Sequence, residues 1–153
     1  MDLNQKLIEE AKQFLKNNNV ASLATISHAL AKPEAAIIFY YYDNRNALYF
    51  TTLSNSRKIK NISINNNVAL TICNAENKQE LQIEGNASII DNPDDTILLI
   101  GFIYKAIKND SNWPILKLHP KDLTVVRIVI KWFKYSNFTE NNSVLEGNFA
   151  DWI

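Results

Sequence analysis

The chain of 153 residues has few of the residue types that make turns, cross-link chains or bind metals: one cysteine, two histidines, three glycines and four prolines. A single cysteine excludes a disulfide within the chain and a metal cluster built on cysteines. Cys73 lies in an apolar run, so we expect a buried, unreactive thiol. No spacing of histidine, cysteine and carboxylate residues is typical of a zinc or non-haem iron site.

The chain also has no excess charge of either sign, because sixteen basic and sixteen acidic residues cancel. No overall field therefore attracts it to nucleic acid or to an anionic membrane. The N-terminal segment lacks an apolar core of signal-peptide length, and no stretch reaches the length of a membrane span. We expect a cytoplasmic protein with neither nucleic acid nor membrane as a partner.

Two segments have apolar residues at helical spacing. Residues 2–16 predict an amphipathic N-terminal helix, and residues from 94 or 95 to about 108 predict a second helix. The predicted inner face of the second helix consists of Ile97, Leu98, Gly101, Phe102 and Ala106. The length fits one domain, 1–153, in which 1–18 is the helical N-terminal segment and 139–153 a polar C-terminal tail.

The remaining pattern is that of short strands. Turn-forming clusters separate candidate strands at 20–27, 34–42, 47–52, 68–75 and 80–90, and 123–138 offers two more. Gly85, inside a long run, predicts a bulge or a bend. Six or seven short antiparallel strands with few helices predict a mainly β protein built as a barrel. A short helix at 55–66, between the third and fourth strands, makes it a split barrel.

A basic, hydroxyl-rich corner lies between the third and fourth strands. Residues 44–75 include Arg45, Arg57, Lys58 and Lys60 and no acidic residue. Hydroxyl groups flank these cations, and Ser56 or Asn55 can cap the helix that follows. This combination is suited to a phosphomonoester, which needs both positive charge and directed donors. The alternative is a solvated basic helix start whose hydroxyls only form turns; nucleic acid is a weaker third interpretation.

The ordered series "LYFTT", "SRK", "NNNVALTI" and "LQIEG" resembles the FMN-binding split-barrel flavoproteins of the pyridoxamine 5'-phosphate oxidase-like superfamily. The resemblance covers about 20–90, is closest to the small general-stress-protein branch, and extends to the closing strands at 123–138. It implies a mainly β split barrel with flanking helices. It also implies a homodimer that holds FMN in grooves at the subunit interface.

The resemblance also implies the residues that hold the flavin. Thr51 and Thr52 would follow the phosphate and ribityl chain, and Arg57 and Lys58 would bind the phosphate. Backbone of 37–39 would face the ring, the 80–85 strand would come from the partner subunit, and the loop after the second helix would line the substrate face. The predicted cofactor-binding residues are Ile37, Ile38, Phe39, Thr51, Thr52, Ser56, Arg57, Lys58, Glu80, Gln82 and Trp113.

The chain departs from the true oxidase at several positions. That enzyme has basic residues where Ala36 and Tyr41 stand, and a glutamine near the ring where this chain has Glu80, or Gln79 after a one-residue slip. The C-terminal block with a tryptophan and substrate-binding arginines is missing. We therefore expect no pyridoxine phosphate oxidase activity.

The expected function is that of an FMN-dependent oxidoreductase acting on a small substrate, with a reduced nicotinamide or another electron donor. No catalytic residue is assigned, because the flavin supplies the redox chemistry. One alternative is a flavin-binding, flavin-storing or stress-related binding protein without turnover. Another is a relative that uses a deazaflavin, or haem ligated by His28 or His119.

Overall fold

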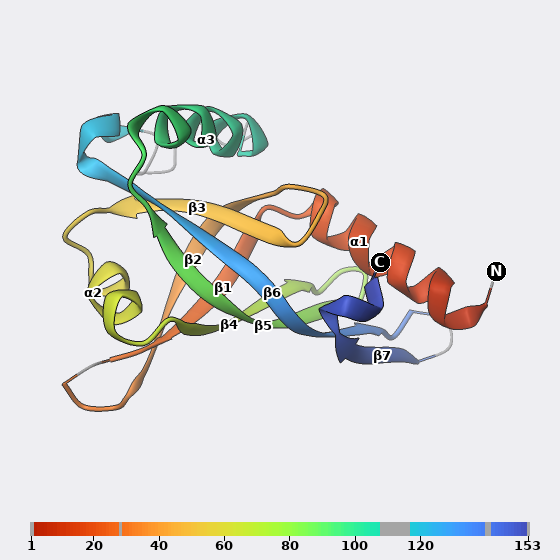
Figure 1. Ribbon diagram of the computed structural model, residues 1–153. Coiled ribbons are helices and arrows are strands. Elements are labelled where there is room, and N and C mark those ends of the chain that lie inside the picture. The colour runs from red at the N-terminus through yellow and green to blue at the C-terminus, as the bar shows by residue number, and fades with distance from the viewer. Residues whose placement is uncertain (1, 28, 108–116, 140–141, 153) are drawn as a thin grey trace.

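The computed structural model describes residues 2–27, 29–107, 117–139 and 142–152. Figure 1 shows how its helices and strands are arranged. They are α1 (Leu3–Asn17), β1 (Val20–Ile26), β2 (Pro33–Tyr42), β3 (Ala47–Leu53), α2 (Arg57–Ile64), β4 (Asn67–Asn74), β5 (Gln79–Ile90), α3 (Pro93–Ala106), β6 (Leu123–Asn137) and β7 (Ser143–Asn148).

The strands form a closed barrel. They lie in the order β3-β2-β1-β4-β5-β6-β7, and β3 also pairs with β6, so six strands close the barrel and β7 extends it. Each strand pairing is antiparallel. Alternate side chains of β1 and β4 enter the interior, as expected from the period of two in a strand. The predicted mainly β split barrel is confirmed.

β6 is one strand of 15 residues, where the sequence pattern indicated two short ones. Its first half pairs with β3 and its second half with β7, while β5 runs beside both halves. The register with β5 shifts between Glu84 and Gly85, which confirms the bulge predicted at this glycine. A Cβ added to Gly85 would lie 2.5 Å from the carbonyl oxygen of Val129, so no other residue fits without a shift of the backbone.

α1 and α2 cover opposite ends of the barrel, and α3 lies along the side next to β3 (Figure 1). α1 buries Leu7, Ala11, Phe14 and Leu15, which are spaced at one to four residues and therefore share one face. α2 begins at Arg57, where the Oγ of Ser56 accepts a hydrogen bond from the backbone N–H of Ile59 at 3.4 Å.

α3 presents a different face to the barrel from the one expected. The helix buries Ile100 and Ile103, whereas Ile97, Leu98 and Phe102 are exposed by 69%, 58% and 40%. All five residues of the predicted inner face are exposed. The prediction was wrong because α3 has apolar residues all round, so that helical spacing does not distinguish its two sides. The helix therefore carries an apolar outer face.

Two further expectations about burial are corrected. The expected polar tail contains β7 and a 3-10 turn at Phe149–Trp152, and the rings of Phe149 and Trp152 are buried in the core. The ring of Trp152 contacts that of Phe133 with 4.5 Å between centroids. The thiol of Cys73 is exposed, not buried, because this residue lies on the outer face of β4. None of the described helices is long and apolar enough to cross a lipid bilayer.

Candidate functional site

The ladder of strand pairs around the barrel is interrupted between β2 and β3, and we call this interruption the opening. These strands form a hairpin but pair only where Tyr40–Tyr42 faces Leu48–Phe50. Beyond that point the first part of β2, 33–39, pairs with β1, and the last part of β3, 51–53, pairs with β6. The two strands therefore diverge toward the end of the barrel that α2 covers (Figure 1).

The first turn of α2 closes the end of this opening and forms what we call the α2 corner. The corner encloses a cavity of about 250 Å³ that is lined by Thr25, Glu34, Ala35, Ala36, Ser56, Arg57 and Lys58. Ser56, the N-cap, accepts a further hydrogen bond from the hydroxyl of Thr52 at 3.3 Å. The start of a helix presents backbone N–H groups and a partial positive charge, which favours an anion. Three of the predicted cofactor-binding residues thus line one cavity.

The α2 corner also contains a carboxylate, which the sequence analysis missed. Glu34, near the start of β2, accepts a hydrogen bond from the guanidinium of Arg57 at 3.2 Å. Its second oxygen accepts from the amide of Asn61 at 2.9 Å, and the same amide donates to the hydroxyl of Thr25 at 3.0 Å. Residues 44–75 contain no acidic side chain, but the pairing of Glu34 with Thr25 across the β1–β2 hairpin brings one into the corner. The short β1–β2 hairpin could have been recognised in the sequence, and it would have placed Glu34 opposite Thr25 near the start of α2.

Lys58 is the second cation of the α2 corner. Burial lowers the pKa of its ammonium group, and the positive charge of Arg57 lowers this pKa further. An anion placed between the two cations would oppose both effects, because it stabilises the protonated amine. The corner therefore has the electrostatic properties of an anion-binding site.

The two threonines of β3 point to opposite sides of the strand, and each is only 5% exposed. Thr52 donates to Ser56, whereas the hydroxyl of Thr51 is buried and has no hydrogen-bond partner among the described residues. Buried hydroxyl groups are nearly always hydrogen-bonded in folded proteins. The hydroxyl of Thr51 thus departs from this rule, although Thr51 does not line the cavity of the α2 corner.

Ile37, Ile38 and Phe39 lie on the β2 side of the opening with their side chains in different directions. Ile38 is buried in the core, Ile37 is 58% exposed on the outer face, and Phe39 packs against the cluster under α3. Ile37 and Phe39 thus point to the outer side of the strand and Ile38 to the inner side. What they present in common to the opening is the edge of the strand, as the prediction of backbone contacts requires.

Glu80 and Gln82 are not brought to the α2 corner within one chain. Both lie on the outer face of β5, where the amide of Gln82 donates to Glu80 at 3.2 Å, and β1 and β4 separate this strand from β2. Gln79 points elsewhere, since its amide donates to the hydroxyl of Tyr135 at 2.9 Å. A role for Glu80 and Gln82 in flavin binding stays a prediction. It requires that these residues come from a second copy of the chain.

Other candidate residues have a structural explanation or lie outside the described residues. Trp113 and His28 belong to the ranges that the structure does not describe. His119 is exposed, and its Nδ1 accepts a hydrogen bond from the backbone N–H of Lys121 at 3.2 Å. At the two positions where the true oxidase has cations, Ala36 lines the α2 corner, and the ring of Tyr41 stacks on that of Phe102 at 5.3 Å.

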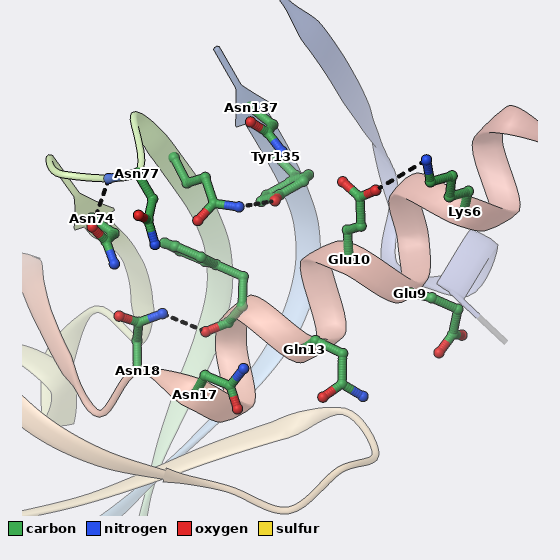
Figure 2. Close-up of a pocket in the computed structure, with 12 residues that line it drawn as sticks. Lys6, Glu9, Glu10, Gln13, Asn17, Asn18, Asn74, Asn77, Tyr135 and Asn137 are labelled. Atoms are coloured by element: carbon green, nitrogen blue, oxygen red, sulfur yellow. Dashed lines mark hydrogen bonds and ion pairs between the residues drawn. The ribbon is translucent and has the colours of Figure 1, made fainter. Parts of the chain in front are cut away.

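A larger cavity lies at the other end of the barrel, between α1 and the β4–β5 turn (Figure 2). This amide pocket has a volume of about 520 Å³ and is lined mainly by Asn and Gln side chains, with Lys6, Glu9, Glu10, Phe14 and Tyr135. Lys6 pairs with Glu10 at 3.9 Å, and Asn18 donates to the carbonyl of Phe14 at 2.7 Å. Several of its polar groups are thus bonded to one another.

Structures with the same fold include a protein from Clostridium acetobutylicum related to general stress protein 26, of the pyridoxinephosphate oxidase family. It is 14% identical, the match covers 99% of this chain and 100% of that one, and the TM-score is 0.75. An F420 reductase is 20% identical over 80% of this chain and 94% of its own, with a TM-score of 0.66. A heme binding protein from Mycobacterium smegmatis is 14% identical over 95% and 59%, with a TM-score of 0.70.

These likenesses establish the fold alone, because their sequence identities are low. No curated protein sequence matches the chain significantly. The model of one protein family, described as pyridoxamine 5'-phosphate oxidase, matches residues 7–136, which is most of the chain. This match includes both strands that flank the opening and the whole α2 corner. The chain therefore belongs to the pyridoxamine 5'-phosphate oxidase family.

Proposed function

We propose that this protein binds FMN in the opening between β2 and β3 and acts, as a homodimer, as an oxidoreductase on a small substrate. The observation that carries the proposal is that the opening ends at two adjacent cations and a helix N-terminus. A planar cofactor with a phosphorylated tail matches this arrangement. Its phosphate would lie at the two cations, and its ring would lie along the opening. Family membership supports the same cofactor.

The residues present fit FMN in three respects. Ser56, Arg57 and Lys58 would hold the phosphate at the α2 corner, where the first N–H groups of α2 add donors. The unpartnered buried hydroxyl of Thr51 would bond to the cofactor, which would remove an unsatisfied polar group. The edge of β2 at 37–39 would supply backbone groups to the ring.

The outer face of the sheet supports a dimer. Across β2, β1, β4 and β5, one row of neighbouring side chains consists of Ile37, Ser22, Thr71 and Gln82, and the adjacent row of Ala35, Ala24, Ala69 and Glu84. Ile37 is 58% exposed and Val20, on the same face, 39% exposed. Exposed aliphatic groups on such a face favour its contact with another surface, here a second copy of the chain. A partner docked here would place its Glu80 and Gln82 near the opening.

When bound, FMN supplies the transfer of hydride or electrons between a donor and the substrate. The chain's own residues would bind the phosphate at the α2 corner and orient the ring by the strand edges. No protein acid or base is required. Pyridoxine phosphate oxidase activity is not proposed, because Ala36 and Tyr41 replace the cations of that enzyme's second-strand motif.

The test is a visible spectrum of the protein purified without added cofactor, repeated after incubation with FMN and desalting. We expect retained bands near ~370 and ~450 nm, the signature of oxidised flavin. Bleaching of these bands by NADH or NADPH without oxygen would support the oxidoreductase. Retained flavin that neither nucleotide reduces would favour a storage or binding protein.

A protein that does not bind FMN would contradict the proposal. A Soret band in the purified protein would then indicate haem, and selective binding of a deazaflavin would indicate that cofactor. Both alternatives have structural neighbours with the same fold, the heme binding protein and the F420 reductase. Their shared fold makes the spectrum, not the architecture, decisive.

A further inference from the structure

Glu34 occupies the place in the α2 corner that an anionic ligand would take. One carboxylate oxygen lies 3.2 Å from the guanidinium of Arg57, and the other lies 2.9 Å from the amide nitrogen of Asn61. Both contacts use donors that would otherwise serve an anion. The proposed phosphate site therefore contains a negative charge of the protein itself.

The structure holds Glu34 more firmly than Arg57. Asn61 is 6% exposed, and its amide also donates to the hydroxyl of Thr25, which is 1% exposed. The side chain of Glu34 is 25% exposed, whereas that of Arg57 is 78% exposed. One buried donor, the amide of Asn61, thus holds the carboxylate, while the guanidinium extends into solvent and can turn to another partner. A ligand therefore displaces Arg57 from Glu34 more easily than it displaces Glu34 from the corner.

We propose that Glu34 is a specificity-determining residue of the α2 corner, which competes with a phosphate group for Arg57 and selects against highly charged phosphates. This inference rests on the proposed function. With Arg57, Lys58 and Glu34 counted together, the corner carries one net positive charge. A phosphomonoester brings close to two negative charges at pH 8, and the carboxylate repels each of them. A singly charged phosphodiester or an uncharged tail is penalised less.

The test compares two ligands that differ only in the phosphate, FMN and riboflavin, by fluorescence titration at pH 8 and low salt. Glu34→Gln keeps the shape of the side chain and an oxygen that accepts from Asn61, but removes the charge. We expect this variant to bind FMN about tenfold more tightly than the parent, as loss of one nearby repulsion would allow. Riboflavin affinity should change less than about twofold, because it has no charge to repel.

Glu9→Gln is the matched control. It removes the same charge from another ion pair, 3.0 Å from Lys12, at the opposite end of the barrel. It should leave both affinities unchanged. Glu34→Ala serves as a second variant should Glu34→Gln unfold, and thermal unfolding of each protein establishes that the comparison is between folded chains.

Three outcomes would overturn the inference while the proposed function stands: unchanged FMN affinity, weaker FMN affinity, or equal tightening of riboflavin and FMN. Weaker binding would show that Glu34 only positions α2. Failure of the parent and both variants to bind either flavin would refute the proposed function instead. Inorganic phosphate, titrated by calorimetry, then decides the inference: tighter binding by Glu34→Gln supports it, and no difference overturns it.

Discussion

The two ends of the barrel carry cavities of opposite character. The amide pocket under α1 is about twice as large as the α2 corner, 520 Å³ against 250 Å³, and is lined by neutral amides and by charges of both signs. The α2 corner gathers two adjacent cations, a capped helix start and a carboxylate in little space. Volume alone does not favour the α2 corner, because the amide pocket is the larger of the two. The proposed function rests instead on the concentrated charge of the corner.

The physical reason lies in how each end is closed. α1 packs on the barrel through four buried apolar residues, and the side chains at its rim bond to one another. α2 is shorter and buries Asn61 and Ile62 alone among its residues. The side chains of its first turn, 57–60, are exposed or half-buried. Four predictions test this contrast.

The largest effect is expected from removal of both cations of the α2 corner. Arg57→Ala with Lys58→Ala should weaken FMN binding by about a hundredfold or more, because two charge-assisted contacts to the phosphate are lost. Flavin fluorescence titration measures the change. The matched double variant, Lys6→Ala with Lys12→Ala, removes two cations from α1 and should bind FMN as the parent does. Equal affinities in the two double variants would contradict the assignment of the corner.

The next largest effect concerns the partner subunit. Ala69 is exposed on the outer face of β4. Arginine at this position should therefore not disturb the fold of one chain, but it would not fit between two sheets that pack face to face. Ala69→Arg should give a monomer in light scattering and weaken FMN binding by at least about tenfold, since one side of each groove is removed. Ile97→Arg, on the apolar outer face of α3, should leave the dimer intact. Should Ile97→Arg alone dissociate it, the interface lies on α3.

A smaller effect is expected from pH. The pKa of Lys58 is lowered in the ligand-free protein, and a bound phosphate would raise it, so binding takes up a proton once the free amine is neutral. FMN affinity should be level from about pH 7, where the phosphate is mostly doubly charged, up to this pKa, and above it should fall by up to about tenfold per pH unit. The fall should begin at a lower pH than for an ordinary lysine. Lys58→Arg should abolish it, and persistence in that variant would assign the titration elsewhere.

The smallest effect should come from the amide pocket. Tyr135→Phe removes a buried hydroxyl that accepts from Gln79 at 2.9 Å. We expect the free energy of unfolding to fall by about 1 kcal/mol, the usual net value of such a bond. FMN affinity should not change, in contrast to the variants of the α2 corner. A marked loss of FMN binding would show that the amide pocket takes part in the function.

Sequence reasoning succeeded where one strand or one turn decides the structure. Alternation fixed the strands, Gly85 marked a bulge, and Ser56 with Arg57 marked a helix start. It failed for features that depend on contacts between distant segments. The carboxylate of Glu34, for example, is brought to the α2 corner by the β1–β2 hairpin. It failed again in α3, whose uniformly apolar residues suit either face. The single long β6 was missed because its partner changes along its length.

The divergence of β2 and β3 has a consequence for how this fold changes in evolution. A slot formed by strand edges recognises a flat ring through main-chain atoms, which every amino acid supplies. Mutation can therefore replace most of the surrounding side chains without erasing the slot, and a few charges at its end suffice to change the preferred tail. Structures named for F420 and for heme share this architecture at 14–20% identity.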